Sequence, residues 1–130
     1  MPRVFAFRGK SLEELQKMSL ADYSKLITAR QRRALKRMSL GYKQLMGIIE
    51  EVKKNGGGKV IKTQLREAVI LPSWVGVKFA VHDGKEFKEM TITPDMLGHR
   101  LGEFAFTTKR VVHSAPGIRA TRGSKFLAVK

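Results

Sequence analysis

Residues 75–92, VGVKFAVHDGKEFKEMTI, contain the pattern that decides the fold. Apolar residues recur at every second position from Val75 to His82, a period that is typical of a half-buried strand. Asp83-Gly84 follows directly, and this dipeptide favours a two-residue type I′ turn because both central positions need positive φ. The sequence therefore predicts a β-hairpin whose return strand runs from Glu86 to Ile92.

Strand-like and turn-like segments flank this hairpin. Val60 to Leu71 is an apolar run that Pro72 closes, which predicts another strand. Thr93-Pro94-Asp95 places proline at a first helical position, so one or two helical turns should begin there and end at Gly98. Trp74 admits two interpretations, stacking on a base or half-buried packing under the sheet, and the second is favoured.

The front of the chain carries repeated helix signals. Three hydroxyl residues each have a partner three positions later that suits a helix start: Ser11 with Glu14, Ser19 with Asp22, and Thr28 with Gln31. From Thr28 onward the apolar residues recur at helical spacing, which predicts one long amphipathic helix ending before the glycines at 56–58. Its apolar stripe would consist of Leu35, Met38, Tyr42, Leu45, Ile49 and Val52.

These elements predict a single α+β domain over residues 1–130. N-terminal helices would pack on a small three-stranded mixed sheet, and an extended basic C-terminal tail would follow. The expected parts are a basic helical region at 1–54, a glycine-rich connection at 55–59, an α+β core at 60–106 and the tail at 107–130. A chain of 130 residues can bury one hydrophobic core of this kind.

The charge balance points to a polyanionic partner. The sequence has 26 Lys and Arg against 11 Asp and Glu, a formal net charge of +15. No acidic residue occurs between Asp22 and Glu50, and residues 104–130 carry six basic residues and no acidic ones. Such a one-sided surface suits nucleic acid or an anionic membrane surface. The basic candidates on the two flanks are Arg3, Arg8, Lys10, Arg30, Arg32, Arg33, Lys36, Arg37 and Lys43 at the front, and His113, Arg119, Arg122 and Lys125 in the tail.

Other site chemistries find little support. The chain has no cysteine, and His82, His99 and His113 lie 17 and 14 residues apart, so neither a metal site nor a cofactor is expected. No serine sits in a nucleophile turn, and Gly56-Gly57-Gly58-Lys59 lacks the hydroxyl residue of a phosphate loop. We also expect no membrane span, no small-molecule substrate, and a cytoplasmic location.

Several motifs together resemble a known family. Asp83-Gly84-Lys85, Ile92, Leu97-Gly98-His99-Arg100-Leu101-Gly102-Glu103-Phe104 and Thr107 resemble the signature of the universal small-subunit ribosomal protein family numbered nineteen, whose eukaryotic cytosolic counterpart is numbered fifteen. The similarity extends to residues 62–66, 70–72, 28–33 and 116–118. The helical front half, which bacterial relatives lack, makes the chain similar to archaeal members.

The resemblance implies a non-enzymatic component of the small ribosomal subunit. It implies binding to ribosomal RNA in the head of the subunit beside the universal small-subunit protein thirteen, with the tail near the decoding region and transfer RNA. It further implies an RNA-facing turn and a cationic surround. The turn would be Gly98, His99, Gly102, Glu103 and Phe104, and the surround Lys62, Arg66, Lys85, Arg100, Lys109 and Arg110. Glu103 could orient an arginine, which is favoured, accept from a base or ribose hydroxyl, or cap locally.

Two other functions fit parts of the sequence. An architectural DNA-binding protein could also use a basic helix and a hairpin. A membrane-surface or calmodulin-binding helix could lie at 28–54, although it would leave the hairpin and the tail without a role. A nuclease is the least favoured alternative, because no cluster of carboxylates able to hold magnesium is evident.

Overall fold

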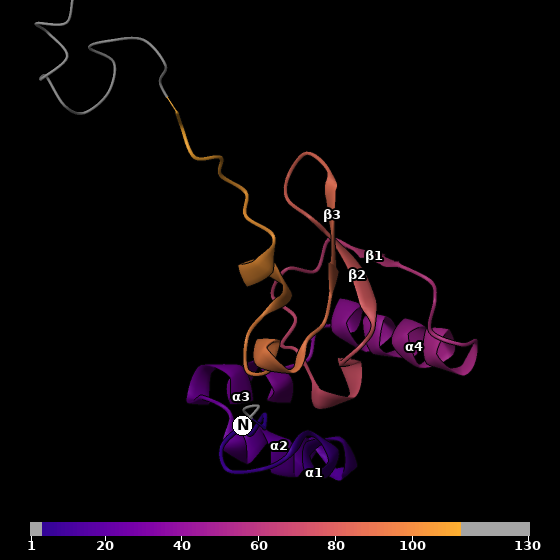
Figure 1. Ribbon diagram of the computed structural model, residues 1–130, viewed down its shortest axis with the longest axis vertical. Coiled ribbons are helices and arrows are strands. Elements are labelled where there is room, and N and C mark those ends of the chain that lie inside the picture. The colour runs from indigo at the N-terminus through magenta and orange to yellow at the C-terminus, as the bar shows by residue number, and fades with distance from the viewer. Residues whose placement is uncertain (1–3, 113–130) are drawn as a thin grey trace, which may run out of the picture.

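The computed structural model describes residues 4–112, which form helices against a small sheet (Figure 1). The α-helices are α1 (Leu12–Lys17), α2 (Leu20–Leu26), α3 (Ala29–Lys36) and α4 (Leu40–Lys54). The strands are β1 (Ile61–Thr63), β2 (Lys78–His82) and β3 (Phe87–Thr91). Three short 3-10 helices, η1 (Pro72–Trp74), η2 (Pro94–Met96) and η3 (Leu101–Phe104), complete the described part. The predicted α+β class with a three-stranded mixed sheet is confirmed.

Helices begin after all three predicted hydroxyl residues, and the two serines cap them as predicted. Ser11 and Glu14 form a reciprocal capping box at the start of α1. Ser19 caps α2 by accepting the Asp22 N–H. Thr28 precedes α3 with extended backbone, but its side chain makes no capping bond. The two serine caps thus satisfy N–H groups that a helix end leaves without an internal partner.

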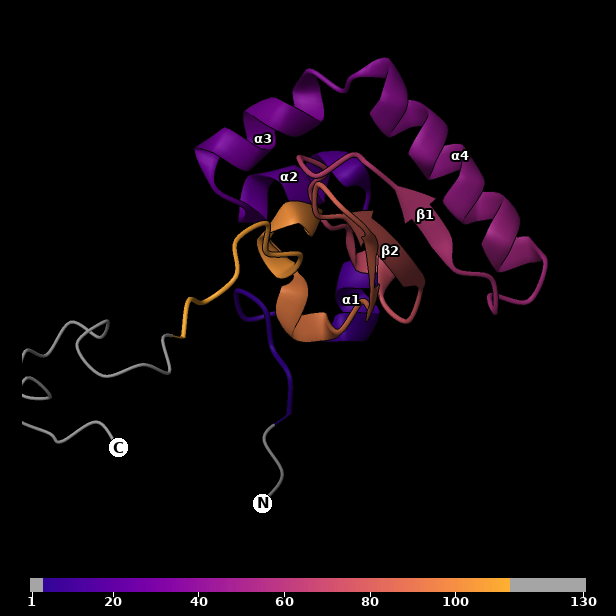
Figure 2. The same ribbon diagram turned by 90° about the horizontal axis from the view of Figure 1, so that it is seen from above.

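The prediction of a single helix over residues 28–54 is wrong, because this segment forms two helices. α3 ends at Lys36, and α4 starts at Leu40 after Ser39, whose Oγ accepts the Tyr42 N–H at 3.3 Å. The apolar stripe stays in phase across this break, so periodicity alone conceals it. Figure 2 shows α3 and α4 meeting at an angle, with α4 running beside β1.

The sheet order is β1-β2-β3, with β1 parallel and β3 antiparallel to β2. Ile61, Phe79 and Met90 stand side by side on the face that packs on the core. Ile61 and Phe79 are 4% and 0% exposed, so this row of the face is closed to water. The opposite face carries the register row of Lys62 and Glu89 across the strands and is called here the outer face.

The strand predicted over Val60–Leu71 is regular only in β1. Beyond it, Ala68 to Leu71 are all buried, and Val69 makes a single bridge to Arg100. Two backbone carbonyls of this segment accept hydrogen bonds from tyrosine hydroxyls. Tyr23 donates to the Ile70 carbonyl at 3.1 Å, and Tyr42 donates to the Val69 carbonyl at 2.9 Å. Burial raises the pKa of Tyr23 to about 12, so its hydroxyl keeps its proton and remains a donor.

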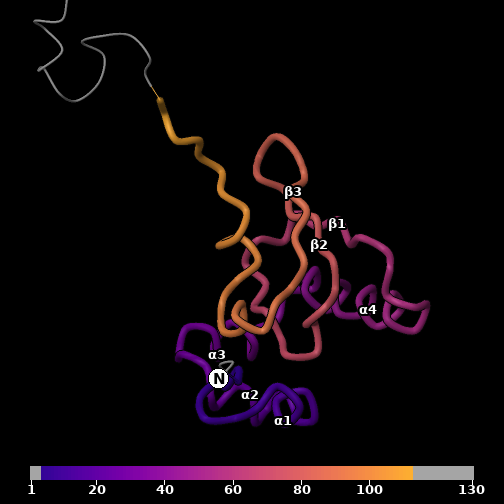
Figure 3. The backbone as a smooth tube through the Cα atoms, viewed as in Figure 1, coloured from indigo at the N-terminus to yellow at the C-terminus, as the bar shows by residue number. Residues whose placement is uncertain are grey.

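The hairpin is confirmed, but its turn differs from the expected two-residue type. The last pair is His82 with Phe87, so the loop is the four residues 83–86. Asp83 Oδ1 accepts the N–H groups of Lys85 and Glu86, both at 2.9 Å, and these bonds hold the loop. Figure 3 shows the hairpin loop at the end of the sheet farthest from α1 and α2.

The core joins the helical front to the sheet. Trp74 is 2% exposed and lies between Tyr42 of α4 and Phe79 of β2, with ring centroids 5.8 and 5.6 Å away. The favoured interpretation of Trp74 as packing under the sheet is therefore confirmed, but the side chain is fully buried and not half-buried as predicted. The predicted short helix at Thr93-Pro94-Asp95 is also confirmed as η2, and Gly98 follows it with φ +79°.

Candidate nucleic-acid interface

Most basic side chains of the described part are not paired with acidic ones. Between residues 4 and 112, the ion pairs are Lys25 with Asp22, Lys88 with Asp83, and His99 with Glu103. An ordinary solvated surface mixes both signs of charge. The remaining cations of residues 4–112 are therefore available to an external polyanion, unless their donors are bonded inside the chain.

The outward side of α3 presents a line of arginines. Arg30 and Arg33 lie in α3 and Arg37 is its C-cap residue, and their spacing of three and four residues places them on one side of the helix. All three are exposed, and the first turn of α3 contains no acidic residue. This spacing brings three guanidinium groups to one surface, where they could contact successive phosphates.

Arg100, far along the chain, extends this line. It lines a shallow depression together with Arg37, Ser39 and Glu67, at the junction between α3 and α4. The bridge from Val69 to Arg100 holds the backbone there. Arg30, Arg33, Arg37 and Arg100 are called here the arginine row. The Glu67 carboxylate lies beside the Arg37–Arg100 end of the row. Four guanidinium groups outnumber it, so the surface is cationic overall.

The turn at 98–104 lies against two distant parts of the chain. A side chain at Gly98 would come within 3.2 Å of the Phe7 ring, and the Gln31 amide of α3 donates to the Gly98 carbonyl. Gly98 also has φ +79°, a conformation that favours glycine. The turn therefore requires glycine at this position to meet both the N-terminal segment and α3.

Glu103 does not orient an arginine in this structure. Its Oε2 lies 2.5 Å from His99 Nδ1, one helical turn earlier, and the two side chains are about half exposed. The Phe104 ring meets the His99 ring edge to face at 5.7 Å. Glu103 therefore fixes the imidazole of His99, and the favoured expectation of an arginine partner is wrong.

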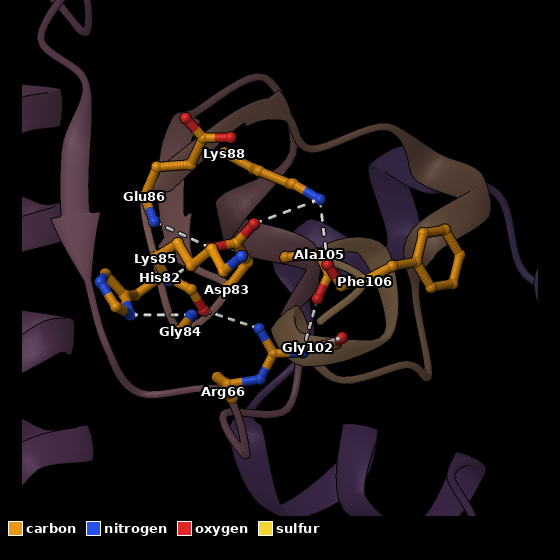
Figure 4. Close-up of polar contacts among 10 residues, drawn as sticks. All are labelled: Arg66, His82, Asp83, Gly84, Lys85, Glu86, Lys88, Gly102, Ala105 and Phe106. Atoms are coloured by element: carbon orange, nitrogen blue, oxygen red, sulfur yellow. Dashed lines mark hydrogen bonds and ion pairs between the residues drawn. The ribbon is translucent and has the colours of Figure 1, made fainter. Parts of the chain in front are cut away.

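Arg66 is bonded to the backbone of its own chain (Figure 4). Its Nη1 donates to the His82 carbonyl at 2.7 Å, and its Nη2 donates to the Gly102 and Ala105 carbonyls at 2.8 and 2.5 Å. Gly102 returns a bond to the Arg66 carbonyl. A Cβ at Gly102 would lie 2.9 Å from Arg66 Cβ, so only glycine fits without movement. Arg66 joins the hairpin base to η3 and is a structural residue.

Arg32 has a similar internal use. Its Nε donates to the Ser24 carbonyl at 2.9 Å, and its Nη2 donates to the Ile27 and Lys25 carbonyls at 3.2 and 3.4 Å. These carbonyls lie at the C-terminal end of α2, where a helix leaves acceptors without an internal donor. Arg32 therefore caps α2, whereas its neighbour Arg33 is exposed.

The other predicted residues are spread over the surface. Lys10 is half-buried, and Phe7 and Lys10 close a tight turn in which Arg8 has φ 53°. Those that are exposed are Arg8, Lys36, Lys43, Lys62, Lys85, Lys109 and Arg110. Those that lie outside the described residues are Arg3, His113, Arg119, Arg122 and Lys125.

One exposed residue that the sequence analysis did not single out stands out beside these cations. Phe87 is 38% exposed on the outer face, in contact with Lys62 and His82. The sequence could have indicated this residue, because alternation along β2 and β3 places the Phe87 ring on the same face as basic residues.

Other kinds of site are not seen in residues 4–112. No helix in this part of the chain combines the length and the apolar character that crossing a bilayer requires. No group of three histidine, aspartate or glutamate side chains there is arranged to hold a metal ion. In residues 4–112 the candidate functional groups are therefore exposed basic side chains.

Comparison with known proteins agrees with the motifs. The family model described as Ribosomal protein S19 matches residues 32–113. The small ribosomal subunit protein uS19 of Saccharolobus solfataricus is 48% identical over 128 residues, which cover 97% of this chain and 91% of that protein. The protein of the same name from Metallosphaera sedula is 46% identical over the same shares of the two chains. Both relatives are archaeal, as the resemblance predicted. The chain belongs to the ribosomal protein S19 family.

Proposed function

We propose that this chain binds small-subunit ribosomal RNA in the head of the subunit, next to the universal small-subunit protein thirteen. As a family member it is a structural component of the cytoplasmic ribosome and not an enzyme. The RNA contact, its place in the head and the neighbouring proteins are the proposed part.

The arginine row is the observation that carries this proposal. Arg30, Arg33 and Arg37 are exposed on one side of α3, and Arg100 adds a fourth guanidinium at the junction with α4. Neutralising phosphates releases condensed counterions, which supplies most of the non-specific affinity for nucleic acid. Arg32 and Arg66 are left out of the proposed interface, because their donors hold backbone carbonyls.

The geometry of the row favours recognition of RNA shape over reading of bases. Its members come from two segments that are rigidly joined through Val69 and Gly98. A fixed set of guanidinium groups suits phosphates that converge in a folded RNA. Duplex DNA also presents rows of phosphates, so architectural DNA binding is the alternative that the competition experiment below decides.

The proposed path of the C-terminal tail rests on the resemblance to the family. Lys109 and Arg110 are exposed beyond η3, and the Phe106 carbonyl is bonded by Lys88 at 2.9 Å. We propose that this tail extends toward the decoding region and contacts transfer RNA. Residues 113–130, which carry most of its charge, lie outside the described residues.

Competition binding at physiological salt tests the proposal. Labelled RNA spanning the small-subunit head would be challenged with an excess of duplex DNA and, separately, of unrelated folded RNA. We expect the complex to survive both competitors. Loss to duplex DNA would favour the architectural DNA-binding alternative, and loss to unrelated RNA would leave only a general affinity for polyanions.

A further inference from the structure

The outer face of the sheet is open and carries both aromatic and basic side chains. In register it presents Lys62 of β1 opposite Ala80 and Glu89, with the pairs Lys78–Thr91 and His82–Phe87 on either side. Lys62, Lys78, Phe87, Glu89 and Thr91 are exposed around the buried Ala80, whereas Ile61, Phe79 and Val81 on the opposite face are buried. The described core therefore does not explain the aromatic ring on this face.

Phe87 is held by one residue from each of the other two strands. The Lys62 ammonium lies over the Phe87 ring, 5.8 Å from its centroid, so it covers one face and leaves the opposite face for a base. The His82 ring meets Phe87 edge to face, with centroids 4.9 Å apart and an interplanar angle of 73°. Ala80 on the intervening strand has only a methyl group, which leaves room for the lysine to reach across β2. The ring is thus fixed in position while 38% of the residue stays exposed.

The groups around the ring match the chemistry of a nucleotide. An exposed aromatic ring on an open sheet stacks on unpaired bases, and an adjacent ammonium can bind the phosphate. His82 Nδ1 accepts the Gly84 N–H at 3.0 Å, so the proton of its neutral ring lies on Nε2. His82 thus contacts Phe87 through its ring, while its Nδ1 is engaged by the hairpin loop. Glu89 shares this face, but two lysines outnumber it there.

We infer that Phe87 is a stacking site for an unpaired base of RNA, with Lys62 as the partner of that nucleotide's phosphate. The inference rests on the proposed binding of ribosomal RNA and adds a second contact, distinct from the arginine row. A base on Phe87 would contribute an attraction that depends little on salt, unlike the contacts of the arginines.

The first test compares Phe87→Leu with Lys62→Gln in binding to RNA spanning the subunit head, over a range of salt. Stacking of one base predicts that Phe87→Leu weakens binding by about 5- to 140-fold with no change in salt slope. Lys62→Gln should weaken binding and flatten the slope by about one phosphate contact. Phe106→Leu is the matched control, because Phe106 is 70% exposed but lies outside the sheet. Equal losses in Phe87→Leu and Phe106→Leu would overturn the inference.

A second variant gives a direct signal and does not depend on a loss of binding. Phe87→Trp places an indole on the outer face, and its fluorescence should be quenched when RNA binds. The only native tryptophan, Trp74, is 2% exposed, so the unchanged chain gives the background. Bound RNA without quenching would overturn the inference.

Two further outcomes separate the possible failures. If the unchanged protein loses the head RNA to both competitors, the proposed function fails irrespective of Phe87. If Phe87→Leu leaves RNA affinity unchanged but weakens binding of a neighbouring head protein, the outer face binds protein, and the stacking site is wrong. Thermal melting of each variant shows whether the fold is retained.

Discussion

Two regions of this molecule use arginine in opposite ways. In the joint formed by Arg66 and Gly102, the guanidinium group is bonded to three backbone carbonyls and ties the hairpin base to η3. On the outward side of α3, Arg33 and Arg37 are exposed, and neither guanidinium is paired with a carboxylate of residues 4–112. Positive charge alone therefore does not select the residues that we propose as RNA contacts. The proposal selects them by whether their donors are already bonded inside the fold.

The largest effect expected from this difference is on stability, in Arg66→Met. The substitution removes bonds to the His82, Gly102 and Ala105 carbonyls and leaves them without that donor. At about 1 kcal/mol for each bond, the free energy of unfolding should fall by about 3 kcal/mol. Urea unfolding measures this change. Lys85→Met, which removes an exposed cation of the hairpin loop, is the control and should change stability little; equal losses would refute a structural role for Arg66.

A smaller loss is expected for Gly102→Ala in the same joint. The added Cβ would lie 2.9 Å from Arg66 Cβ and 3.0 Å from the Arg66 carbonyl oxygen. Relieving such overpacking costs about 1–3 kcal/mol of unfolding free energy. Gly47→Ala is the matched control, because nothing lies within 4 Å of a Cβ there. In the interior of α4 that change should stabilise by up to about 1 kcal/mol. A neutral Gly102→Ala variant would show that the joint is loose.

The hairpin loop should add a smaller, pH-dependent effect. The N–H groups of Glu86 and Lys85, with the Lys88 ammonium, hold the pKa of Asp83 well below its ordinary value of 3.8. A depressed pKa means that the carboxylate stabilises the folded state above pH 4, and this stability is lost as the pH falls below about 4. Amide exchange in β2 and β3 at decreasing pH should show the loss in the unchanged chain. Asp83→Asn should show a smaller loss of amide protection as the pH falls, and the control Asp95→Asn should show the same loss as the unchanged chain. Identical acid profiles for Asp83→Asn and the unchanged chain would contradict this.

Local signals in the sequence predicted much of the fold. Ser11 and Ser19 begin helices, and the alternation from Val75 to His82 led to the hairpin. The break at Ser39 also had a local signal, because Met38-Ser39-Leu40 repeats the tripeptide Met18-Ser19-Leu20 that begins α2. The continuous apolar stripe was given more weight than that repeat, and the predicted helix was therefore too long.

The use of each arginine could not be predicted from the sequence. The partners of Arg66 lie 16 to 39 residues away, and they come within reach only after the sheet and η3 have packed. Backbone carbonyls also carry no sequence signal, since every residue has one. Arg32 and Arg33 are identical in type and adjacent in the chain, yet only the first faces the end of α2.

That adjacent pair provides the most direct measurement: the salt dependence of binding to head RNA for Arg33→Ala/Arg37→Ala and for Arg32→Ala, with thermal unfolding of each. The account predicts that the double variant flattens the salt slope by about 1.5 and keeps its stability, since each phosphate contact contributes about 0.7–0.9. Arg32→Ala should keep the slope and lose about 1–2 kcal/mol of unfolding free energy. An unchanged slope in the double variant, or an equally flattened slope in Arg32→Ala, would contradict the account.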